Sequence, residues 1–216
     1  MKILALDTCL DACSAALWED GAGLAGLSEP MQRGHQERLA PMVAEVMAAT
    51  AFTDLDRIAV TVGPGSFTGL RVGLAFAKGL ALALDKPCIG VGVLEALAMG
   101  SGPAGFVAAC LDARRGQVYL QVFADGRAIM APDVLPLEIA AARLAELWSG
   151  GPATLTGSGA PLLAGVLAKA RIETPRSPDP AVVALIAARA RAPFPPPRPL
   201  YLRAPDAKLP GGISPP

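Results

Sequence analysis

The stretch TVGPGSFTGLR, residues 61–71, follows an apolar segment at residues 57–62 and opens a long apolar segment that reaches Leu84. Its glycines at positions 63, 65 and 69 allow the backbone to turn tightly and to approach another part of the chain closely. The pattern predicts a strand, a glycine loop and a helix in succession. The free N–H groups at the start of such a helix attract anions. This unit therefore indicates an α/β fold.

The helix after the loop carries small residues at every fourth position, Gly69, Gly73, Ala77 and Ala81. Such a stripe lets another helix approach closely. The remaining positions are also mainly apolar, and a helix that is apolar all round is expected to be buried on every side. We therefore expect one side of this helix to belong to a partner.

The flanking sequence predicts a mixed sheet covered by helices in the first half of the chain. Strands lead and then alternate with helices, which is typical of such a sheet. The predicted strands are residues 2–7, 14–18, 21–26, 57–62 and 87–91, and the predicted helices are residues 36–50, 67–84 and 94–99.

The second half also opens with a predicted strand hairpin, which hints at a duplication. Its predicted elements are strands at residues 105–111, 116–124 and 153–156, and helices at residues 137–148, 161–170 and 180–192. A proline-rich segment follows and is expected to be extended or disordered. We divide the chain into an N-terminal lobe (1–102), a C-terminal lobe (103–192) and a tail (193–216) that packs on the fold or trails from it.

Composition narrows the class of protein. The formal net charge is zero, so there is no general basic footprint for nucleic acid, although local patches at Arg114 and Arg115 or at Arg198 and Arg203 remain open. Four cysteines without metal-site spacing are typical of buried thiols in a reducing compartment. No secretory signal is evident, and the long apolar helix is short for a membrane span. We expect a cytoplasmic protein with no membrane association.

Few residues offer catalytic chemistry. The chain has a single histidine, His35, which excludes a multi-histidine metal site. Asp7 and Asp112 each end a predicted strand and could orient a metal ion or water, although turn chemistry explains them as well. Gly65 and Ser66 are candidates for contacting a phosphate, but the Lys-Ser/Thr pair of a phosphate loop is missing. We predict no resident metal or cofactor.

Several segments together resemble the TsaB (YeaZ) family of bacterial tRNA-modification proteins. The resemblance is carried by residues 3–8, 12–17, 35–42, 63–71, 111–119 and 200–203. It implies an actin-like, Hsp70-like ATPase fold with two ribonuclease-H-like lobes. It also implies a non-catalytic subunit in the synthesis of N6-threonylcarbamoyladenosine at tRNA position 37. The related catalytic subunit, TsaD, carries an H-x-x-x-H metal motif, and that register holds Val93 and Leu97 here.

The resemblance further implies a heterodimer with TsaD, built as a four-helix bundle from helices 36–50 and 67–84 of this chain. Residues of suitable character for the interface are Leu39, Met42, Val43, Val46, Met47, Leu70, Gly73, Leu74 and Ala77. A charge introduced by Gly73→Glu or Val43→Asp is expected to abolish pairing and leave the monomer folded. The ATPase TsaE would join the complex, tRNA would be met only through the complex, and the chain alone would form a homodimer.

Two other functions are alternatives to a tRNA-modification subunit. One is an actin-like ATP-dependent small-molecule kinase or ATPase that uses Asp7 and Asp112 at a magnesium–nucleotide site. The other is a metallopeptidase, which fails because one histidine is too few for its metal.

Overall fold

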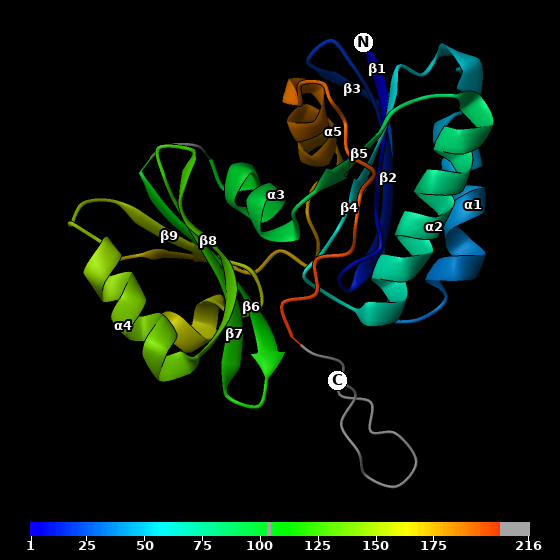
Figure 1. Cartoon of the computed structure of the whole chain (residues 1–216). Coiled ribbons are helices and arrows are strands. Elements are labelled where there is room, and N and C mark those ends of the chain that lie inside the picture. Colours follow the sequence, from blue (N-terminus) through cyan, green and yellow to red (C-terminus); the bar gives the residue numbers. More distant parts are fainter. Residues whose placement is uncertain (103–104, 204–216) are drawn as a thin grey trace, which may run out of the picture.

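The chain forms two five-stranded sheets, each with helices on both faces (Figure 1). The structure is a computed structural model and describes residues 1–102 and 105–203. One sheet comes from each half of the chain, and the α/β class expected from the sequence is confirmed.

The first sheet has the strand order β3-β2-β1-β4-β5. Strand β1 is antiparallel to β2 and parallel to β4. The bounds are β1 Lys2–Asp7, β2 Ala12–Glu19, β3 Ala22–Pro30, β4 Arg57–Thr61 and β5 Cys88–Val91.

The second sheet repeats this plan as β8-β7-β6-β9-β10, with β6 antiparallel to β7 and parallel to β9. The bounds are β6 Phe106–Arg114, β7 Gln117–Ala124, β8 Arg127–Pro136, β9 Ala153–Thr156 and β10 Arg171–Glu173. The equal strand order confirms the hint of duplication. Sequence patterns missed β8, whose Pro132 and Pro136 suit an edge strand but weaken its signal. They also missed the short β10.

Helices cover both sheets, and each sheet receives one helix from the other half of the chain. Helices α1 (His35–Val46) and α2 (Phe67–Leu84) lie side by side on one face of the first sheet, and α4 (Leu137–Leu147) covers the second sheet. The predicted helix at residues 161–170 is wrong, because only the short 3₁₀ helix η2 (Ala160–Leu163) forms there.

The other two helices exchange lobes. Helix α3 (Val93–Gly100) follows the first sheet but packs on β6 and β7 of the second. Helix α5 (Pro180–Arg189) follows the second sheet but packs on β1, β2 and β4 of the first. The expected division at residue 102 therefore separates the two sheets but not the helices that cover them. Residues 103–104, at the expected seam, lie outside the described residues.

Both faces of the first sheet are apolar, which explains the continuous hydrophobic run of β1. Leu4 and Leu6 face the layer of α1 and α2, whereas Ile3 and Ala5 face α5. A strand buried on both faces carries apolar residues without alternation. The carboxyl end of β1 is thereby held rigidly at the junction of the lobes.

After α5 the chain returns along the first lobe as an extended segment. The Arg57 guanidinium donates to the carbonyls of Ala187, Ala188 and Ala190 at the end of α5, and it lies 4.8 Å from the Phe194 ring centre. Farther on, the Leu200 amide donates to the Val62 carbonyl at 2.7 Å. Up to residue 203 the tail thus packs on the fold; residues 204–216 lie outside the described residues.

Candidate functional site

The glycine loop is shaped by close packing against the turn between β1 and β2. A Cβ added at Gly65 would lie 2.2 Å from the Cys9 carbonyl oxygen, and one at Gly69 would lie 2.0 Å from the Thr8 carbonyl oxygen. The Thr8 hydroxyl donates to the Gly69 carbonyl at 2.7 Å. Only glycine allows this approach. The glycines at positions 65 and 69 are therefore explained by a contact within the chain, which holds the start of α2 against the turn between β1 and β2.

Ser66 directly precedes the first residue of α2 and caps the helix. Its hydroxyl accepts a hydrogen bond from the Gly69 amide at 3.3 Å, which satisfies one of the free donors of the first turn. Its own amide donates to the Cys9 carbonyl at 2.7 Å. The loop is thus fixed at both ends by backbone contacts.

A cleft of about 630 Å³ opens between the two lobes beside this loop. Gly65, Ser66 and Asp112, three of the four predicted nucleotide or phosphate residues, contribute to its walls. The full lining is Cys9, Leu10, Asp11, Gly65, Ser66, Leu111, Asp112, Ala113, Arg114, Tyr119, Ser158, Thr174, Pro175 and Arg176.

Asp7, the fourth predicted residue, is completely buried and is not part of that lining. Its Oδ1 accepts hydrogen bonds from the Thr61 hydroxyl at 2.6 Å and from the Cys9 amide at 3.2 Å. Its Oδ2 has no hydrogen-bond partner among the described residues. Burial raises the pKa of this carboxyl to about 6. Asp7 therefore stabilises the turn from within the core and, unlike Asp112, does not line the cleft.

Asp112 lines the cleft from the end of β6, at the irregularity that precedes the turn to β7. Its Oδ1 accepts from the Arg114 amide at 2.7 Å, and its own amide donates to the Ser158 hydroxyl at 3.1 Å. These are the backbone bonds that Asp and Ser make in turns. Among the described residues, no group of three or more His, Cys, Asp or Glu side chains is placed to hold a metal ion.

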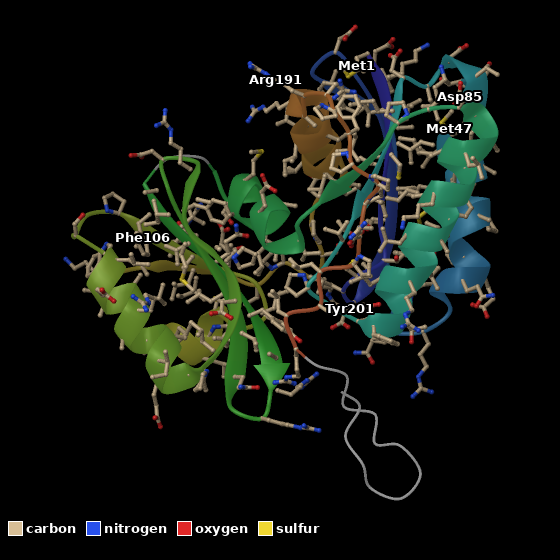
Figure 2. The ribbon with its side chains drawn as sticks, in the orientation of Figure 1. Met1, Met47, Asp85, Phe106, Arg191 and Tyr201 are labelled. Carbon is tan, nitrogen blue, oxygen red and sulfur yellow. The ribbon has the colours of Figure 1, made fainter. Side chains whose placement is uncertain are left out.

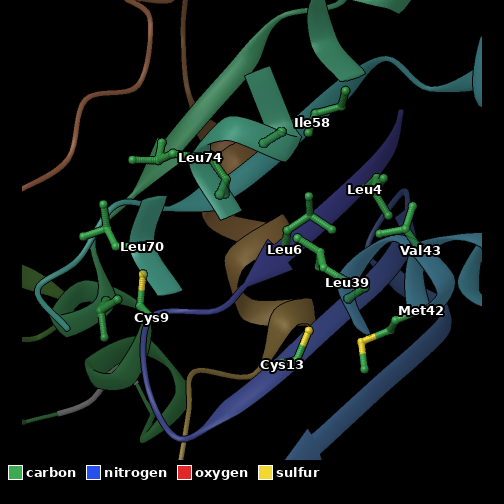
Figure 3. Close-up of a cluster of buried hydrophobic side chains, with 14 of the residues drawn as sticks. Leu4, Leu6, Cys9, Cys13, Leu39, Met42, Val43, Ile58, Leu70 and Leu74 are labelled. Atoms are coloured by element: carbon green, nitrogen blue, oxygen red, sulfur yellow. The ribbon is translucent and has the colours of Figure 1, made fainter. Parts of the chain in front are cut away.

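The nine residues proposed for the partner interface face the interior of this chain, so they cannot supply contacts to a partner. Each is buried, because α1 and α2 turn these side chains onto the first sheet. Figure 3 shows five of them, Leu39, Met42, Val43, Leu70 and Leu74, with the core residues Leu4, Leu6 and Ile58. The corrected residues are Leu39, Met42, Val43, Val46, Met47, Leu70, Gly73, Leu74 and Ala77.

The small-residue stripe likewise faces inward. A Cβ at Gly73 would lie 2.5 Å from the Thr8 hydroxyl oxygen. The expected effect of Gly73→Glu and Val43→Asp is therefore corrected: both charges would enter the core and damage folding itself.

The opposite side of the two helices is the exposed one. Leu82 is 85% exposed and Phe67 is 47% exposed. We call this surface the outer face; its exposed small and apolar residues are Ala40, Pro41, Ala44, Phe67, Ala75, Gly79, Leu82 and Ala83. A third of α2 is buried in the free chain, so the side of the helix expected to meet a partner is uncovered here.

A sequence signal for this surface was available. The two charged residues of α2, Arg71 and Lys78, are both exposed and lie on the outer face. The charges thus mark the solvent side of a helix whose apolar residues do not distinguish one side from another.

The fold places the chain in a structural class of proteins. Two sheets of equal strand order that exchange helices across a cleft form the actin-like, Hsp70-like ATPase fold. The ethanolamine utilization protein EutJ from Carboxydothermus hydrogenoformans shares this fold, with a TM-score of 0.50 and 13% identity over 85% of this chain and 87% of that chain.

Closer relatives identify the family within that class. Residues 28–147 match the sequence profile described as TsaD, tRNA N6-adenosine threonylcarbamoyltransferase. The chain is 45% identical to the tRNA threonylcarbamoyladenosine biosynthesis protein TsaB of Escherichia coli over 124 residues, which cover 55% of this chain and 53% of that protein. The chain thus spans about half the length of that relative.

A solved structure matches over nearly its full length. YeaZ from Pseudomonas aeruginosa has a TM-score of 0.77 and 31% identity, covering 93% of this chain and 99% of that chain. The chain belongs to the TsaB family, also called YeaZ, and the family resemblance found in the sequence is confirmed.

Proposed function

We propose that this chain is a non-catalytic subunit that pairs with and activates TsaD in the synthesis of N6-threonylcarbamoyladenosine at tRNA position 37. TsaE joins the pair, and the chain alone forms a homodimer through the same surface. The complex works in the cytoplasm, without membrane association. The naming of the E. coli relative for this biosynthesis supports the proposal.

The observation that carries the proposal is the uncovered outer face. Helix α2 is long and apolar enough by composition to cross a membrane, yet only a third of it is buried. A contiguous exposed apolar surface marks an interaction site in a protein with a well-packed core. Because α1 and α2 lie side by side, two helices of a partner can complete a four-helix bundle on this surface.

The positions that correspond to the metal ligands of TsaD support a non-catalytic role. Val93 and Leu97 both lie in α3, and both are buried where that helix packs on the second sheet. Their side chains are apolar and take part in the core, so they cannot ligate a metal ion.

An ATP-dependent kinase or ATPase remains the alternative, but the cleft does not favour it. Asp7 is enclosed by its own turn, and the cations that line the cleft are Arg114 and Arg176. Calorimetric titration of the chain with Mg-ATP tests this alternative directly. Saturable binding that is lost in Asp7→Asn would support it.

A substitution on the outer face tests the pairing. Complete burial of a leucine side chain is worth about 2 kcal/mol, and Leu82 is almost fully exposed in the free chain. Leu82→Asp should therefore weaken TsaD binding by at least about 30-fold in calorimetry. Leu162→Asp is the matched control, since Leu162 is exposed on the second lobe. Equal TsaD affinity of the two variants would exclude the outer face as the docking surface.

A further inference from the structure

Arginines from distant parts of the sequence meet at the mouth of the cleft. Arg203 donates to the Gln117 side-chain oxygen, and Gln117 pairs with Arg114 across the turn between β6 and β7. Arg114 lines the cleft together with Arg176, which comes from the loop before α5. Two patches that are separate in the sequence, one near residue 114 and one near residue 203, are therefore a single surface in the fold.

Two exposed aromatic rings extend this surface on the side of α2. The ring centres of Phe67 and Tyr201 are 5.5 Å apart. Phe67 is 47% exposed and Tyr201 is 45% exposed. The Arg71 guanidinium lies 3.7 Å from the Phe67 ring centre and donates to the Tyr201 hydroxyl at 3.2 Å. Ser66, which precedes Phe67, lines the cleft, and Figure 2 shows Tyr201 at the opening between the lobes. The two rings therefore lie beside the cleft without lining it.

We call this surface the arginine rim; it consists of Arg71, Arg114, Arg176 and Arg203 with Phe67 and Tyr201. Its chemistry is that of RNA recognition. Guanidinium groups match phosphate oxygens with two parallel hydrogen bonds, and exposed rings stack on unpaired bases. The chain has no net charge, yet arginine and aromatic side chains lie together at one opening. Such a local cluster is the pattern expected of a binding site for a nucleic-acid strand.

Two carboxylates lie at the same opening. Asp11 and Asp112 line the cleft, and Asp112 Oδ2 is 3.7 Å from an Arg114 nitrogen. That ion pair is exposed, so it contributes little to stability. A phosphate can therefore replace the carboxylate beside Arg114 at a small cost in free energy. The rim keeps more arginines than carboxylates.

We infer that the arginine rim binds the tRNA substrate directly, with arginines on phosphates of the anticodon arm and the rings on unpaired bases. The inference rests on the proposed function and goes beyond it, since the complex alone was expected to bring tRNA to this chain. The rim shares Phe67 and Arg71 with the outer face, whereas Arg114 and Arg176 line the interlobe cleft. Variants of those two arginines therefore test RNA binding apart from the outer face.

Binding of a labelled, unmodified tRNA transcript tests the inference. Fluorescence anisotropy is measured for the chain alone and for its complex with TsaD, over a series of salt concentrations. In Arg114→Glu/Arg176→Glu the slope of log affinity against log salt should fall by about two, because each phosphate contact contributes about one. Affinity near 0.1 M salt should fall at least tenfold.

The matched control is Arg127→Glu/Arg191→Glu. It makes the same change of charge at two exposed arginines. Arg127 lies at the opposite end of β7 and β8 from the Arg114 turn. Arg191 lies at the far end of the first lobe (Figure 2). Its affinity for tRNA should stay within about twofold of the parent. Tyr201→Phe keeps the ring and should bind as the parent does, whereas Tyr201→Ala should lose about tenfold.

Equal losses in the rim and control variants, or no loss in either, would overturn the inference. Co-elution with TsaD, measured on the same variants, separates this result from the proposed function. A parent chain that does not co-elute with TsaD refutes the pairing, while RNA binding by the chain alone still tests the rim. Rim variants that lose TsaD but keep RNA would make the rim a protein contact and would also overturn the inference.

Discussion

Two glycines of α2 provide the sharpest test of how this helix packs on the first sheet. Gly73 faces the core, where a Cβ would lie 2.5 Å from the Thr8 hydroxyl oxygen. Among the described residues, a Cβ at Gly79 would meet no atom within 4 Å other than its chain neighbours and the backbone of its own helix. Both positions are helical and lie in the same 18-residue helix. The same substitution, Gly→Ala, should therefore have opposite effects at the two positions.

The magnitudes follow from three contributions. Alanine in place of glycine inside a helix stabilises by about 1 kcal/mol, and this applies at both positions. At Gly73 the added methyl group forces the Thr8 side chain away from the Gly69 carbonyl, which loses a buried hydrogen bond of about 1 kcal/mol. Overpacking costs about 2 kcal/mol more. We expect Gly79→Ala to stabilise by about 1 kcal/mol and Gly73→Ala to destabilise by about 2 kcal/mol.

Urea denaturation of the two variants and the parent, followed by circular dichroism, measures this difference. In a thermal scan the variants should differ by about 10 °C, since 1 kcal/mol corresponds to about 2–4 °C for a chain of this length. A neutral or stabilising Gly73→Ala would refute the reasoning. So would a Gly79→Ala variant that loses as much stability as Gly73→Ala.

Two further predictions concern buried polar contacts. Burial raises the pKa of Asp7 from 3.8 to about 6, so the stabilisation from its protonated form is complete below about pH 4 and is lost as the pH rises through 6. Asp7→Asn should therefore be more stable than the parent at pH 7.5, by up to about 3 kcal/mol in urea denaturation, and equal to it at pH 4; an advantage independent of pH would contradict this cause. Arg57→Met keeps the side-chain stem but leaves the carbonyls at the end of α5 without their guanidinium donor, which should cost about 2 kcal/mol. Faster hydrogen exchange confined to residues 180–189 and the segment after them is the expected signature, and unchanged exchange there would contradict it.

Much of the fold could be predicted because local patterns and tertiary packing agree in the first half of the chain. The predicted strand at residues 2–7 and the predicted helix at residues 67–84 have the bounds of β1 and α2. The second half was harder. β8 carries two prolines and lies at an edge, and β10 has three residues, so neither gives a periodic signal of useful length.

The candidate sites show where sequence reasoning fails. The apolar residues of α1 and α2 were found correctly, but apolar character does not say which side of a helix meets its own sheet. The small-residue stripe predicts that Gly73 contacts a partner, whereas in the fold Gly73 makes room for Thr8 of the same chain. Asp7 shows the same limit, because a carboxylate at a strand end can be enclosed by its turn or open to a ligand, and only the fold distinguishes the two.

The exchange of α3 and α5 between the sheets makes the two lobes mutually dependent. A fragment that stopped after α3 would expose the apolar side of its sheet, because the helix that shields that side comes from the other end of the chain. The remaining fragment would lack α3 in the same way. During synthesis, the face of the first sheet that α5 covers stays exposed until about residue 189 has emerged. The protein therefore completes its folding as one unit, late in translation.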